Sequence, residues 1–113
     1  MIRVQKAPFD VERELRAVKG RNHRIGGVAL FVGTVRDLSP QGEVSAMTLE
    51  HYPGMTERAL DAIDREAHER FALEASLVVH RYGRLEPGDD IVLVITASAH
   101  REAAFDACRF LMD

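Results

Sequence analysis

The sequence predicts an α+β domain in which helices pack on a mostly antiparallel sheet. Short apolar segments rich in β-branched residues recur along the chain next to Gly and Pro, a pattern typical of strands. Between them, three segments repeat their apolar residues at helical spacing. At 113 residues and 46% hydrophobic content, the chain is long enough for one domain and too short for two. We therefore expect residues 1–113 to form a single domain, with one layer of helices on the sheet.

The N-terminal part predicts a short strand followed by a short helix. Ile2–Gln5 has the composition of a strand, and Pro8 ends it. Asp10 is a good N-cap, so a helix is expected from there to Lys19, with Gly20 as its stop. Its buried face would consist of Val11, Leu15 and Val18.

The next segment predicts two strands joined by a loop. Val28–Val35 is strongly apolar, and Gly33 within it allows a bulge or a close approach of another backbone. Leu38–Gly42 has the composition of a loop, and Val44–Tyr52 alternates loosely, as a strand with two unequal faces does. The economical pairing is a hairpin between Val28–Arg36 and Val44–Tyr52.

A long amphipathic helix is predicted after the Pro53-Gly54 turn, with Thr56 as its N-cap and its end near Phe71. One face of this helix is charged and is expected to be solvated. The stripe expected to be buried consists of Ala59, Leu60, Ile63, Ala67 and Phe71.

The last third of the chain predicts two more strands and a helix. Leu77–Tyr82 is a strand, and the turn at Pro87-Gly88 leads to Ile91–Ala97. That segment carries no charge and is mostly β-branched, which indicates a strand buried on both faces. The spacing then changes at His100-Arg101, where the final helix begins. Its apolar face would include Ala104, Cys108 and Leu111.

The start of this last helix is a candidate anion site. The first turn of a helix offers unpaired N–H groups and the positive end of its dipole, so the cationic His100-Arg101 pair suits a bound anion there. The alternative to an anion site is that Arg101 is only an exposed helix residue and His100 a hydrogen-bonded polar group at a strand end. Arg36 also ends an apolar strand and is a candidate for the same site if it lies near His100. The alternative is that Arg36 is only a surface cation paired with Asp37.

Composition and charge exclude several classes of protein. The net charge of −3 gives no general nucleic-acid footprint. No apolar run approaches ~18 residues and the first residues lack a signal-peptide pattern, so no membrane span and a cytoplasmic location are expected. One cysteine excludes an internal disulfide framework. Neither the histidine spacing nor any glycine-rich motif predicts a metal or nucleotide cofactor.

Three smaller features complete the sequence evidence. Arg21–Arg24 is a basic loop that is interpreted as a solvated turn. Cys108 lies on the apolar stripe of the last helix, where a free cysteine acts as a small core residue rather than as a sulfur relay. Thirteen of the fifteen basic residues are Arg, which suits bidentate recognition of phosphate or carboxylate, and no lysine follows Lys19.

Four stretches together resemble the large, catalytic subunit of molybdopterin synthase, in register across most of the chain. They are FVGTVRD (Phe31–Asp37), LEHYPGMTE (Leu49–Glu57), HRYGRLEPGDD (His80–Asp90) and SAHREAAFDACRFLMD (Ser98–Asp113). The resemblance implies an α/β hammerhead fold with a small antiparallel subdomain. It also implies a sulfurtransferase, without a bound cofactor, that forms the dithiolene of molybdopterin on cyclic pyranopterin monophosphate.

The resemblance further implies partners and site residues. Sulfur would arrive as a Gly-Gly thiocarboxylate on a small ubiquitin-like subunit, and two large subunits would form the central homodimer of a heterotetramer. The His100-Arg101 pair would reach the phosphate pocket from across the dimer interface. The implied substrate-binding residues are Arg36, His100, Arg101, Thr34 and Val35, and the implied apolar lining is Phe31 and Met112.

The chain departs from the family at its catalytic lysines. In the family they follow the position of Asp113, so no catalytic residue falls within 1–113, and arginines cannot replace them because they stay protonated. We expect a further C-terminal segment that carries these lysines. The alternative is a catalytically silent, dimeric anion-binding or assembly module of the same fold.

Overall fold

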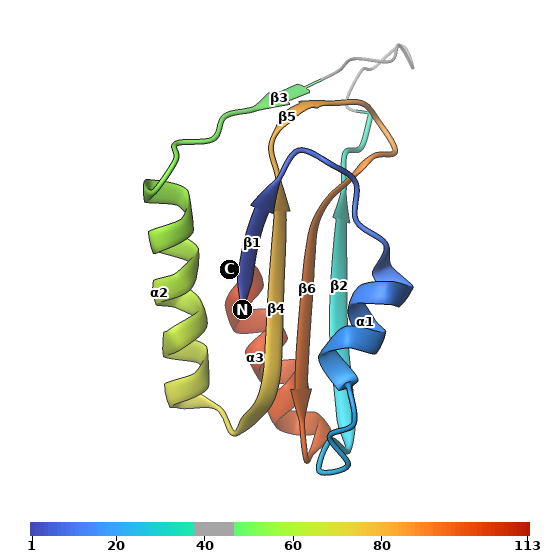
Figure 1. Cartoon of the computed structure of the whole chain (residues 1–113), viewed down its shortest axis with the longest axis vertical. Helices are drawn as coiled ribbons and strands as arrows, with labels where there is room; N and C mark the ends of the chain where they lie inside the picture. Colours follow the sequence, from blue (N-terminus) through green and yellow to red (C-terminus); the bar gives the residue numbers. More distant parts are fainter. Residues whose placement is uncertain (38–46) are drawn as a thin grey trace.

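The computed structural model describes residues 1–37 and 47–113, which form a mixed α+β structure (Figure 1). One sheet has the strand order β1-β4-β6-β2, and a second sheet pairs β3 with β5. β1 runs parallel to β4, whereas the pairs β4–β6, β2–β6 and β3–β5 are antiparallel. The strands are β1 (Ile2–Gln5), β2 (Gly27–Thr34), β3 (Met47–Leu49), β4 (Leu73–Arg81), β5 (Gly83–Leu85) and β6 (Asp90–Ser98), and the helices are α1 (Val11–Lys19), α2 (Met55–Arg70) and α3 (Arg101–Met112). The predicted α+β class and mostly antiparallel sheet are confirmed.

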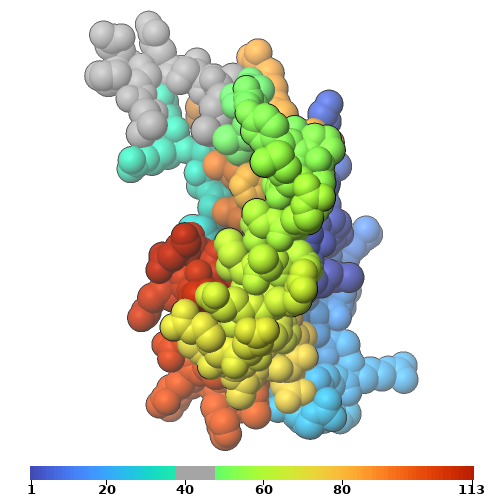
Figure 2. Space-filling model, turned by 90° about the vertical axis from the view of Figure 1, so that its left-hand side faces the viewer, coloured from blue at the N-terminus to red at the C-terminus, as the bar shows by residue number. Residues whose placement is uncertain are grey.

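The helices cover both faces of the larger sheet, so the prediction of a single helical layer is wrong. α1 packs on one face through the predicted residues Val11, Leu15 and Val18. α3 packs on the other face through Ala104 and Cys108, with α2 beside it (Figures 1 and 2). The two central strands are apolar on both sides, and each side therefore needs its own cover.

The predicted hairpin between Val28–Arg36 and Val44–Tyr52 is also wrong. β2 pairs with β6, and the short β3 pairs with β5. β6 is buried along most of its length, and a strand of that kind needs a neighbour on each side, which β2 and β4 provide. Of the predicted second strand, Glu50–Tyr52 are not in a strand, and residues 44–46 lie outside the described residues. The predicted Leu38–Gly42 loop lies outside them as well.

α2 begins earlier than its sequence predicted. Its N-cap is Gly54, with φ +85°, rather than Thr56. Glu57 closes this helix start by accepting a hydrogen bond from the Gly54 N–H at 2.5 Å. Glycine tolerates the left-handed backbone here, and the acidic side chain supplies the capping acceptor that glycine lacks.

The buried stripe of α2 is only partly the predicted one. Ala67 is fully buried as expected, but Ile63 is 42% exposed. Asp64 is buried in its place, at 6% exposure, and accepts hydrogen bonds from the Met1 amino group at 2.7 Å and the Ser76 hydroxyl at 2.6 Å. A carboxylate tolerates burial when its oxygens are paired, and a pattern of apolar residues cannot reveal such pairing.

Candidate active site

The His100–Arg101 pair lies where β6 ends and α3 begins. His100 is the N-cap residue, with φ −126° and ψ 140°, and its side chain does not cap the first N–H groups of the helix. Both side chains are exposed, and with Gly26, Ala99 and Glu102 they line a depression of about 440 Å³. The start of α3 thus presents backbone donors beside an imidazole and a guanidinium, which suits an anion.

Two glycines at the start of β2 fix the position of this pair. A Cβ atom on Gly26 would lie 2.1 Å from the carbonyl oxygen of Ala99, and a Cβ atom on Gly27 would lie 3.1 Å from Arg101 Cα. Only residues without a side chain allow the two backbones to come so close. The sequence interpretation missed this role, although two glycines directly before an apolar strand were the available signal.

Arg36 lies just beyond the opposite end of β2. The register between β2 and β6 shifts between Gly33 and Thr34, and a Cβ atom on Gly33 would lie 2.6 Å from Val92 Cγ1. The bulge predicted at Gly33 is therefore confirmed, whereas the close neighbour is the side chain of Val92 rather than another backbone. The bulge re-aims the end of the strand that carries Thr34 and Arg36, whose side chains are exposed.

Val35 anchors this strand end between the two exposed residues. It is 6% exposed, and its N–H donates to the Asp89 carbonyl at 2.9 Å. Its own carbonyl accepts from the Gly88 N–H at 2.7 Å. The buried side chain and the occupied backbone groups tie Arg36 to the turn that leads into β6.

A single copy of the chain keeps these two groups of residues far apart. β2 and β6 are antiparallel, with Gly27 opposite Ser98 and Thr34 opposite Asp90. At ~3.4 Å per residue, the strand from Gly27 to Thr34 spans about 24 Å. Arg36 and His100 therefore cannot hold the same phosphate group within one copy.

Phe31 and Met112, the predicted apolar lining, do come together. They are 40% and 43% exposed, and both line a groove of about 330 Å³. The groove lies on the sheet face that α2 and α3 cover, and its wall also includes Leu60, Ile63, Val78, His80, Val92 and Val94. It offers a mostly apolar surface with the imidazole of His80 and with Asp113, separate from the depression at the start of α3.

Other chemistry is limited within the part of the chain that the structure describes. Cys108 is a core residue, as predicted, and burial raises the pKa of its thiol, which disfavours the reactive thiolate. No group of three or more His, Cys, Asp or Glu side chains within residues 1–37 and 47–113 could hold a metal ion. Over the same residues, no helix has the length and hydropathy needed to cross a bilayer.

The fold and these surfaces define an α+β protein with cationic strand ends and an apolar groove. Residues 4–113 match the family described as MoaE protein, and the chain belongs to that family. A molybdopterin synthase catalytic subunit from Pseudomonas aeruginosa is 57% identical over 112 residues, which cover 99% of this chain and 75% of the relative. The resemblance inferred from the four sequence stretches is confirmed.

Solved structures agree with this assignment. The molybdopterin biosynthesis MoaE protein from Burkholderia ambifaria has a TM-score of 0.91 and 51% identity, over 99% of this chain and 73% of that one. Molybdopterin synthase from Staphylococcus aureus has a TM-score of 0.87 and 27% identity, over 97% of this chain and 79% of that one.

Proposed function

We propose that the chain acts as the catalytic subunit of a molybdopterin synthase in the cytoplasm. The enzyme transfers sulfur from the C-terminal thiocarboxylate of a small ubiquitin-like subunit to cyclic pyranopterin monophosphate. Two transfers form the dithiolene of molybdopterin, a step of molybdenum cofactor biosynthesis. Membership of the MoaE family and the high identity to a catalytic subunit support this function.

The separation of Arg36 from His100 and Arg101 is the observation that carries the site assignment. β2, which joins the two groups, is an edge strand of the sheet. It carries no charge, and at its middle Leu30 and Phe31 are 41% and 40% exposed. An uncharged edge strand with exposed apolar side chains is suited to pairing with a second copy of itself.

Antiparallel pairing of two β2 strands would assemble the site. If the two-fold axis passes through Phe31, which then lies opposite itself, Val35 of one copy lies opposite Gly27 of the other, and Arg36 opposite Gly26. Gly26 and Gly27 pack against the residues that carry the His100–Arg101 pair. Arg36 of one copy then faces His100 and Arg101 of the second copy, and each dimer contains two such sites.

Each site residue then has a defined task. Arg36 and Arg101 bind the phosphate as charge-assisted donors, supported by His100 and the N–H groups at the start of α3. Thr34 contributes a hydroxyl, Val35 holds the strand end, and the groove of Phe31 and Met112 receives apolar parts of the bound groups. These residues bind and orient, while proton transfer requires the lysines that the family carries after the position of Asp113.

Mixed dimers test the shared site. Arg36→Ala and Arg101→Ala should each lower synthase turnover strongly while leaving the dimer folded, because each removes a phosphate donor. When the two variants are refolded together with the small subunit, half of the dimers are mixed and each mixed dimer has one intact site. About a quarter of the wild-type turnover should therefore return.

His100→Ala mixed with Arg101→Ala is the matched control. Both residues come from the same strand end, so every site in a mixed dimer keeps one defect and no turnover should return. Equal recovery in the two mixtures would refute the shared site. A wild-type dimer that binds the pterin without transferring sulfur would instead identify the catalytically silent module.

A further inference from the structure

We infer that the basic loop Arg21–Arg24 steers the anionic substrate toward the His100–Arg101 pair, and that Glu74 is the positioning residue that holds this loop. The inference rests on the proposed function, because the substrate it concerns is the phosphorylated pterin. It adds a role to the solvated turn predicted from the sequence, whose Arg21, His23 and Arg24 side chains are exposed.

Glu74 ties the loop to the start of β4. Its Oε1 atom accepts hydrogen bonds from Asn22 Nδ2 at 2.9 Å and from Arg24 Nε at 3.0 Å. Inside the loop, the Arg24 N–H donates to the Asn22 side-chain oxygen at 2.9 Å. The Asn22 hydrogen bond, and then that of Arg24, lower the pKa of Glu74, so the carboxylate is ionised at neutral pH. One carboxylate of β4 thus joins two side chains of the loop, which restrains the loop relative to the strand.

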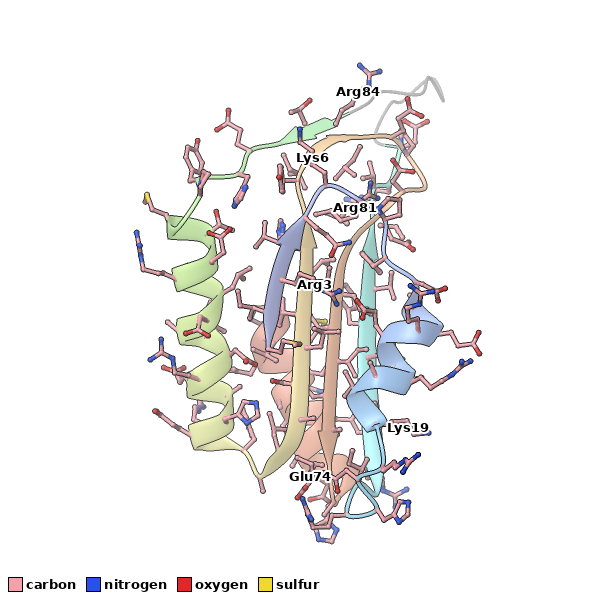
Figure 3. All side chains as sticks on the ribbon, in the orientation of Figure 1. Arg3, Lys6, Lys19, Glu74, Arg81 and Arg84 are labelled. Carbon is pink, nitrogen blue, oxygen red and sulfur yellow. The ribbon has the colours of Figure 1, made fainter. Side chains whose placement is uncertain are left out.

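The loop lies at the same end of the molecule as the anion site. Leu73 and Gly27 both pair with Ser98, so the starts of β4 and β2 flank the end of β6. Figure 1 shows the connection from α1 to β2 at the bottom of the molecule, close to the start of α3. Figure 3 places Glu74 at this end, with Lys19 slightly above it. Two residues after the loop, the Gly26 N–H donates to the Ser98 carbonyl at 2.8 Å, at the strand end that carries His100.

The charge of this end contrasts with that of the whole chain. The side chains of Arg21, His23 and Arg101 are exposed, whereas Arg24 is paired with Glu74. The chain as a whole has a net charge of −3, so it does not attract anions generally. The depression at the start of α3 is lined by His100, Arg101 and the acidic Glu102. Further positive charge from Arg21 at the same end would raise the capture rate of an anion there, and salt would screen the effect.

A charge reversal with a matched control tests the steering. Arg21→Glu, in the full-length protein assembled with its thiocarboxylated small subunit, should lower kcat/KM for the pterin about three- to fivefold at low ionic strength. The difference should disappear near ~0.5 M salt, and kcat should stay unchanged. Arg13→Glu makes the same charge change at an exposed position in the first turn of α1, and it should have a clearly smaller effect.

Glu74→Gln separates positioning from charge. The substitution removes a negative charge, so a purely electrostatic role predicts a higher kcat/KM for the pterin. A positioning role predicts a lower value, and it also predicts that Arg21→Glu has little further effect in the Glu74→Gln background. A higher value, or an undiminished effect of Arg21→Glu, would overturn the assignment of Glu74.

Two results would overturn the steering itself. One is an unchanged kcat/KM for the pterin at low salt, and the other is a change confined to the KM for the small subunit. If the wild-type protein transfers no sulfur, the proposed function fails. The affinity for inorganic phosphate then tests whether the loop attracts anions. Weaker phosphate binding by the Arg21→Glu dimer at low salt would support the loop's role, and equal binding would refute it.

Discussion

Gly26→Ala would disturb the proposed site through the backbone that carries His100 and Arg101, and not by changing either of these side chains. The added methyl group would lie 2.1 Å from the Ala99 carbonyl oxygen, which is backbone and cannot rotate away. An ordinary carbon–oxygen contact is about 3.3 Å, so the two segments must separate by about 1.2 Å. That displacement falls on the residue directly before His100.

The expected cost can be divided between stability and activity. Overpacking of this kind costs roughly 1–3 kcal/mol of unfolding free energy. A 1 Å misplacement of binding groups costs about 10²-fold in rate, so kcat/KM for the pterin should fall by about that factor. Urea unfolding and steady-state sulfur transfer at 25 °C measure the two effects on the same samples.

Val79→Ala provides the control for stability alone. Val79 is fully buried on the sheet face that α1 covers, and its truncation should cost about 2 kcal/mol. While the variant remains folded, its kcat/KM should match that of the wild type. If Gly26→Ala loses stability but keeps its kcat/KM within about twofold, the close approach of Gly26 does not set the position of the His100–Arg101 pair.

Two further substitutions probe groups away from the anion site. Cys108→Ser should retain sulfur transfer in a single-turnover assay and lose about 1–2 kcal/mol in urea unfolding, because a hydroxyl replaces a buried thiol; loss of transfer in a folded variant would reveal a thiol relay. Hydrogen bonds from His51 and from the Gly54 N–H lower the pKa of Glu57 below its usual 4.5. Its stabilising contribution is therefore present above pH 4.5 and is lost as pH falls through the lower, folded-state pKa. Glu57→Gln should flatten this acid-side loss in urea unfolding between pH 6 and 3, and identical profiles would contradict the assignment.

Local signals in the sequence were sufficient for some elements of the fold. α1 begins after Asp10 and ends at Gly20, as predicted. A capping carboxylate and a glycine with positive φ act within a few residues of the backbone groups they satisfy. The apolar run of β6 likewise predicted a strand buried on both faces. These features depend on neighbouring residues, so a single sequence contains them.

Pairing and buried charge required the folded chain. The hairpin prediction favoured neighbours in sequence, whereas β2 pairs with β6 from the other end of the chain because that strand needs two partners. The burial of Asp64 was not predicted, since nothing near it in sequence shows that Met1 and Ser76 will meet its carboxylate. Long-range contacts of this kind leave no periodic signal.

The candidate site shows the same division between local and distant information. The chemistry of Arg36, His100 and Arg101 follows from residue type and from their place at strand and helix ends. That these residues act together does not follow from the sequence, because within one copy they are separated by the length of β2. Gly26 and Gly27 were overlooked for a related reason, since a missing side chain has meaning only when the opposing backbone is known.

If the site is divided between two copies, as proposed, substrate binding is linked to dimerisation. Bringing Arg36 of one copy near Arg101 of the other places like charges together, which weakens the empty dimer. A phosphate between them turns that repulsion into two favourable contacts, so the anion binds the dimer better than the separated copies. Any ligand with that preference stabilises the assembled state by mass action. In the proposed dimer, the exposed Leu30 and Phe31 in the middle of β2 would supply the association energy that offsets the charged ends when the site is empty.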